Sequence, residues 1–110
     1  MGDDKRTRPI YSSRADDPAF IDTIDAFVIS LAERIDHLQD AEGEGDFGRV
    51  ARLARALARE SDEVGYEPLG ELARGVCMAA LAEKTDEARA QIVVLTATAR
   101  RARMGHPGAF

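Results

Sequence analysis

The sequence has few of the residues that carry metal, redox or nucleophilic chemistry. Its 110 residues include one cysteine, two histidines and no tryptophan. The single cysteine, Cys77, excludes an internal disulfide and a cysteine-based zinc site, and we interpret it as a small buried hydrophobic residue. There is no glycine-rich phosphate loop, no Ser/His/Asp set and no Cys/His pair at a useful spacing. We therefore expect no metal site, no cofactor and no enzymatic activity of these kinds.

Three further absences narrow the classes of partner and location. The formal net charge of −5 is the opposite of the positive charge typical of a nucleic-acid-binding protein. No apolar run reaches the roughly 18 residues that a membrane span needs. The opening residues, MGDDKRTRPIYSSRADD, lack the apolar core of a secretory signal. We expect no nucleic-acid partner, no membrane partner and a cytoplasmic location.

What the sequence does contain favours one helical domain. Apolar residues make up 45% of the chain but aromatic residues only 5%, so a core must come from Leu, Ile, Val and Ala. Alanine, arginine and glutamate, which favour helices, are abundant. A chain of this length suits one domain. We divide it into an N-terminal arm (1–15), a helical domain (16–104) and a flexible tail (105–110) that contains His106.

The first helix is predicted by a long apolar period. It should begin near Asp16 or Asp17, with Pro18 in its first turn, and should end in the glycine-rich turn that follows. We expect the arm before it to be extended and held by Ile10 and Tyr11. The apolar positions alternate between steps of four and three, as one helix face requires. They are Phe20, Ile24, Phe27, Leu31, Ile35 and Leu38.

The second predicted helix has an apolar side and a cationic side. Asp46 is placed to cap its start, and Gly65 is placed to end it in the left-handed conformation. At 100° per residue, Arg52, Arg55 and Arg59 fall on the side opposite the apolar residues. Those apolar residues are Val50, Leu53, Ala54, Leu57 and Val64.

Two more helices are predicted after this one. The third covers about 67–83 with Pro68 in its first turn, and the fourth covers roughly 86–103 with Thr85 as its N-cap. Four helices joined by short connections favour an all-α fold, an antiparallel up-down four-helix bundle with an extended N-terminal arm. The residues expected in its core from these two helices are Leu69, Leu72, Ala73, Val76, Ala80, Ile92, Leu95, Ala99 and Ala102.

Residues 53–59, LARALAR, followed by Gly65 and Leu69, resemble the histidine-containing phosphotransfer (HPt) domains of two-component phosphorelays. The signature of that family is His-x-Leu-Lys-Gly on the second long helix, with another glycine six residues after the first. Leu57 stands at the leucine position and Gly65 at the second glycine. The resemblance covers residues 9 to about 103. It implies a four-helix bundle that binds a response-regulator receiver domain or a histidine kinase.

The resemblance fails at the residues that carry the family's chemistry. Arg55 stands at the phosphoacceptor histidine, Ala58 at the lysine and Arg59 at the first glycine. A guanidinium stays protonated and has no free lone pair, so Arg55 cannot attack an aspartyl phosphate. The resemblance therefore implies a degenerate HPt domain that transfers no phosphate. Its partner-binding residues would be Arg52, Arg55, Ala58 and Arg59.

Four other interpretations stay open. The arginine row could bind an unrelated anionic partner, including a phosphorylated one. The arginine row could be a solvated surface, with Arg59 paired to Glu63 four residues later. An active phosphotransfer protein could use another residue, and His37 on the exposed side of the first helix is the candidate. A structural module could form a homodimer through apolar residues at helix edges, such as Val93 or Met78.

Overall fold

The computed structural model describes residues 8–106, which form four long helices and one short 3₁₀ helix. No strand occurs among these residues, which confirms the predicted all-α class. The elements in chain order are η2 (Pro18–Phe20), α1 (Ile21–Gly43), α2 (Phe47–Glu63), α3 (Glu67–Leu81) and α4 (Thr85–Met104).

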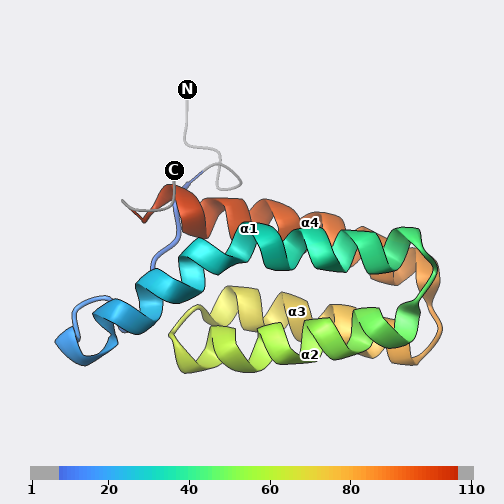
Figure 1. Ribbon diagram of the computed structural model, residues 1–110, viewed down its shortest axis with the longest axis horizontal. Coiled ribbons are helices and arrows are strands. Elements are labelled where there is room, and N and C mark those ends of the chain that lie inside the picture. Colours follow the sequence, from blue (N-terminus) through green and yellow to red (C-terminus); the bar gives the residue numbers. More distant parts are fainter. Residues whose placement is uncertain (1–7, 107–110) are drawn as a thin grey trace.

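The four helices lie in two layers around one core (Figure 1). In this view α1 and α4 form the upper layer, and α2 and α3 form the lower layer. Each helix packs against its neighbours in sequence, and α1 also packs against α4. The core is made of aliphatic and alanine side chains with few aromatic rings. Its largest fully buried side chains are Leu31, Leu38, Leu57, Leu69 and Leu95.

The predicted apolar face of α1 is buried, but the helix begins later than expected. The predicted start is instead the 3₁₀ helix Pro18–Phe20, whose N-cap Asp17 accepts a hydrogen bond from the Ala19 N–H at 3.0 Å. Phe20 lies in this short helix and is only partly buried, at the edge of the core. The buried residues of α1 are Ile24, Phe27, Val28, Leu31, Ile35, Leu38 and Ala41.

The turns between the helices follow the predicted capping residues except before α4. Asp46 caps α2 by accepting a hydrogen bond from a backbone N–H of the first turn at 3.0 Å. Gly65 has a left-handed φ of 86°, and Pro68 lies in the first turn of α3. The predicted cap at Thr85 is wrong by one residue. A turn with a left-handed Glu83 (φ 59°) precedes α4, and Thr85 is already the first helical residue.

The N-terminal arm links α4 to the turn between α2 and α3. The Ile10 N–H donates to the Arg101 carbonyl at 3.0 Å. The buried Ser12 hydroxyl donates to the Val64 carbonyl at 2.5 Å. The Tyr11 side chain is 65% exposed. Ile10 packs against the core as predicted, and bonds to backbone carbonyls also hold the arm, whereas Tyr11 is mostly exposed.

Tyr66 lies under the arm just before α3. Its side chain is 3% exposed and stacks on Phe27 with ring centroids 5.8 Å apart. Burial raises the pKa of the Tyr66 phenol above its ordinary value, while a hydrogen bond from the Ser12 backbone acts in the opposite direction. The neutral phenol is therefore part of the core.

The chain just beyond α4 is bound to α1. His106 Nε2 lies 2.9 Å from Asp25 Oδ1, and the His106 side chain is only 13% exposed. Residues 105–106, the first two of the predicted tail, thus lie against α1, and the flexibility of the tail stays a prediction. Residues 107–110 lie outside the described part of the chain.

We expect Gly65→Ala to destabilise the fold by about 1–3 kcal/mol, because its backbone conformation is costly for a residue with a side chain. A Cβ at Gly65 would also lie 2.6 Å from the Ser12 hydroxyl oxygen and 2.8 Å from that of Ser13. Urea unfolding followed by circular dichroism measures the loss. Gly43→Ala is the matched control, since a Cβ there meets nothing within 4 Å. Equal losses in the two variants would contradict this role for Gly65.

Candidate partner-binding surface

The exposed side of α2 carries a row of arginines. Arg52, Arg55 and Arg59 are all exposed, and their spacing of three and four residues puts them on one side of the helix. We call these three residues the arginine face. The predicted opposition of apolar and arginine side chains along α2 is confirmed. The buried residues of α2 are Val50, Ala51, Ala54, Leu57, Ala58 and Ser61.

The arginine face has no carboxylate partner among residues 8–106. By contrast, Arg49 and Arg89 are paired with carboxylates at 3.7 Å and 3.3 Å. The pair considered above between Arg59 and Glu63 is also not formed within this part of the chain. The three guanidinium groups of the arginine face therefore present their N–H donors to water.

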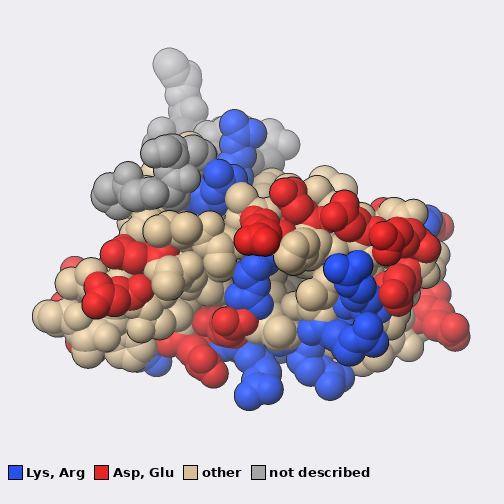
Figure 2. Space-filling view, viewed as in Figure 1, with Lys and Arg blue, Asp and Glu red and all other residues tan. Residues whose placement is uncertain are grey.

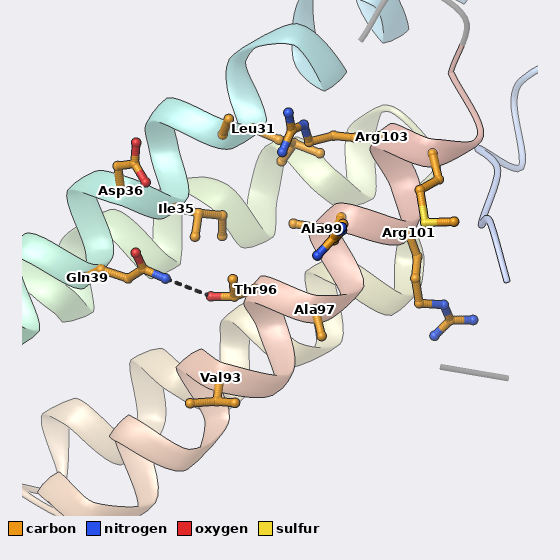
Figure 3. Close-up of a pocket in the computed structure, with 13 residues that line it drawn as sticks. Leu31, Ile35, Asp36, Gln39, Val93, Thr96, Ala97, Ala99, Arg101 and Arg103 are labelled. Carbon is orange, nitrogen blue, oxygen red and sulfur yellow. Dashed lines mark hydrogen bonds between the residues drawn. The ribbon is translucent and has the colours of Figure 1, made fainter. Parts of the chain in front are cut away.

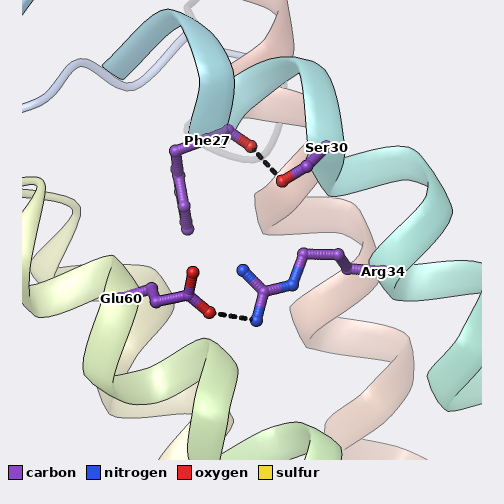
Figure 4. Close-up of polar contacts among 4 residues, drawn as sticks. All are labelled: Phe27, Ser30, Arg34 and Glu60. Carbon is purple, nitrogen blue, oxygen red and sulfur yellow. Dashed lines mark hydrogen bonds and ion pairs between the residues drawn. The ribbon is translucent and has the colours of Figure 1, made fainter. Parts of the chain in front are cut away.

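Two carboxylates of α2 flank the arginine face, but the neighbouring helices use them. Arg34 of α1 reaches across to Glu60 at 2.5 Å (Figure 4). Arg74 of α3 pairs with Asp62 on the other flank. Each acid is turned toward a neighbouring helix, so neither neutralises the arginine face. The sequence alone does not predict these pairs, because pairing across helices depends on how the helices pack.

Charge is segregated on the molecular surface (Figure 2). Lys and Arg side chains gather along the lower edge of this view, over α2. Asp and Glu side chains form a row above them, over α1. The protein carries a formal net charge of −5, yet it presents a cationic strip on one helix. Such a strip attracts an anionic partner to one side of the molecule.

Ala58, the fourth predicted partner-binding residue, lies in the core and not on the surface. It is 3% exposed, and a Cβ added to Gly70 of α3 would lie 3.3 Å from the Ala58 carbonyl oxygen. Three residues beyond Arg55 the helix has turned by about 300°, which brings this position against α3. Ala58 is therefore too buried to contact a partner with its side chain.

The two histidines both pair with carboxylates of α1. His37 Nε2 lies 3.8 Å from Glu33 Oε1, and the His37 side chain is 46% exposed. His106 pairs with Asp25 at the end of the molecule where the arm meets α4. Cys77 is buried, as predicted.

Residues 8–106 offer neither a cluster of metal ligands nor a helix suited to crossing a membrane. No three His, Cys, Asp or Glu side chains in this part of the chain are grouped so that they could hold a metal ion. None of its helices combines the length and the apolar character needed to cross a membrane.

Comparison of the chain with protein-family models, with curated proteins and with solved structures found no match. What the protein binds must therefore be inferred from the chemistry of its surface. A guanidinium offers five N–H donors in a planar fork, binds carboxylate or phosphate groups bidentately and stays protonated. The arginine face can hold an anionic group, but it offers no nucleophile to accept a phosphoryl group.

Proposed function

We propose that this protein is a two-component signalling protein that binds a response-regulator receiver domain or a histidine kinase without transferring phosphate. In this proposal the helices form an HPt-like, antiparallel up-down bundle in the cytoplasm, and the arginine face is the contact surface. The supporting observation is the row of exposed guanidinium groups that have no carboxylate partner in the described chain.

A receiver domain is the partner whose chemistry fits this surface best. The resemblance of residues 53–59 to the HPt signature puts Arg55 where that family's histidine meets the acidic pocket around the receiver's phosphorylatable aspartate. Arg55 would bind carboxylates of this pocket bidentately. Arg52 and Arg59 would extend the cationic row on either side of it. Opposite charges across such a contact raise the association rate and set its register.

Reversing the charge of the arginine face should disrupt this contact. We expect Arg55→Glu/Arg59→Glu to raise the Kd for a receiver domain by about tenfold or more, because attraction becomes repulsion at two positions. Isothermal titration calorimetry against a panel of receiver domains from the same organism measures the Kd. Lys84→Glu is the control, since it reverses an exposed positive charge at the turn before α4. It should leave the Kd nearly unchanged.

Circular dichroism should show the same helicity in both variants, because all the substituted side chains are exposed. Two results would refute the proposal. One is the absence of binding between the unmodified protein and any receiver or kinase domain at tens of micromolar. The other is an equal loss of binding in Lys84→Glu.

The missing nucleophile predicts that the protein takes no phosphoryl group from a phosphorylated receiver domain. After incubation with a radiolabelled phospho-receiver, the chain should carry no label. The active alternative predicts acid-labile, alkali-stable label on His37, which is exposed on α1. Label that disappears in His37→Gln would establish that alternative and rule out a purely non-catalytic role.

A structural or dimerisation module is the second candidate function. The observation that favours it is the exposure of a large apolar side chain on α4, since Val93 is 69% exposed. If this were the protein's only role, reversing the arginine face would change no binding partner.

A further inference from the structure

A groove between α1 and α4 has an apolar floor. It has a volume of about 760 Å³ and lies between the two helices of the upper layer, whereas the arginine face belongs to α2 in the lower layer (Figures 1 and 3). The apolar residues that line it include Leu31, Ile35, Val93, Ala97, Ala99 and Met104.

The α4 side of this groove presents an apolar stripe to water. Val93 is 69% exposed and Met104 is 44% exposed, and Ala97 between them is also exposed. These positions are four and seven residues apart, so they follow one side of the helix. Exposed apolar side chains on one side of a helix favour an interaction site, and here Arg100 and Arg101 lie between Ala97 and Met104 along it. The small side chain of Ala97 lets another helix approach closely.

The two rims of the groove carry opposite charges, and the cationic α4 side includes Arg101 and Arg103 as well as Arg100. Asp36 lies on the α1 rim and Arg100 on the α4 rim, and both are exposed. Neither has an ion-pair partner within the described range 8–106. The Gln39 amide donates to the Thr96 hydroxyl across the groove at 3.3 Å (Figure 3).

Asp36 and Arg100 lie at about the same level of the groove. Gln39 of α1 contacts Thr96 of α4, and Asp25 contacts His106 just beyond α4. The two helices therefore run in opposite directions along the groove. Asp36 precedes Gln39 by three residues in α1, and Arg100 follows Thr96 by four residues in α4. Both steps lead the same way along the groove from the Gln39–Thr96 contact.

We propose that this groove is the interface of a symmetric homodimer, with a second copy of the chain as its occupant. A two-fold axis parallel to the groove places α1 of each copy over α4 of the other. Asp36 then faces the partner's Arg100, and symmetry forms this contact twice. A two-fold axis across the groove would instead bring α1 onto α1 and place like charges together. The charges therefore select the first arrangement.

A second copy fits this groove better than a partner of one charge sign. An acidic partner would be attracted by Arg100 and repelled by Asp36. A basic partner would be attracted by Asp36 and repelled by Arg100. A second copy turned about the axis parallel to the groove brings the α1 rim with Asp36 onto the α4 rim with Arg100, so it matches both rims. An acidic partner held by the α4 arginines alone would leave the chain monomeric by itself, an outcome that the sedimentation test below distinguishes. The inference concerns a different face from the arginine face and does not depend on receiver binding.

The first test is the mass of the full chain in solution, measured by sedimentation over a range of concentrations. The unmodified protein should have the mass of two chains, and Val93→Glu should have the mass of one, because it puts a charge into the apolar stripe. Met78→Glu is the matched control, since Met78 lies on α3 and is equally exposed at 69%. It should remain dimeric.

The second test exchanges the charges on the two rims. Asp36→Arg and Arg100→Glu should each raise the dimer dissociation constant by about tenfold or more, because each creates two like-charge contacts. The double variant Asp36→Arg/Arg100→Glu should recover dimerisation. Circular dichroism confirms that every variant is folded.

Three outcomes would overturn the homodimer. The unmodified chain could be monomeric at every concentration, the double variant could fail to recover, or Met78→Glu could break the dimer while Val93→Glu does not. Titration of monomeric Val93→Glu with a receiver domain separates the two proposals. If receiver binding uses only the arginine face, Val93→Glu should bind the receiver domain with the same Kd as the unmodified protein.

Discussion

Two carboxylates on the flanks of α2 pair with the neighbouring helices and leave the arginines between them exposed. Asp62 lies three residues from Arg59, a spacing that normally forms an ion pair within a helix. It pairs instead with Arg74 of α3, while Glu60 pairs with Arg34 of α1. Both pairs are partly exposed and so contribute little to stability. Their effect is on charge placement, because Glu60 and Asp62 are neutralised by neighbouring helices. The exposed Glu63, four residues beyond Arg59, stays at that end of the row without pairing to it in the described chain.

Helix packing and surface charge are connected at Gly70. A Cβ at this position would lie 2.1 Å from Asp62 Oδ1 and 3.3 Å from the Ala58 carbonyl oxygen. The absence of a side chain lets α2 and α3 approach closely and lets the Asp62 carboxylate lie over α3, within reach of Arg74. The arrangement that keeps Arg59 uncompensated therefore depends on how closely two buried helix faces meet. The opposite layer keeps a second, apolar surface between α1 and α4.

The helices and most of their ends could be predicted from the sequence, because caps such as Asp46 and turns such as Gly65 depend on a few local residues. The burial of Ala58 follows from the same rotation that places the arginines outside, but the resemblance assigned it to the surface. A close helix approach occurs at Gly70, whereas the atoms nearest to a Cβ at Gly75 belong to the Gln91 side chain. Interhelix ion pairs and the docking of the tail depend on tertiary contacts, which local patterns do not specify.

The most direct measurement maps the contact itself. Backbone amide resonances of the isotope-labelled protein can be followed as an unlabelled receiver domain is added at low and high salt. We expect the largest shifts at Arg52, Arg55 and Arg59 and at the exposed residues between them, and we expect these shifts to shrink as salt screens the charges. Shifts confined to the groove between α1 and α4, or unaffected by salt, would contradict docking through the arginine face.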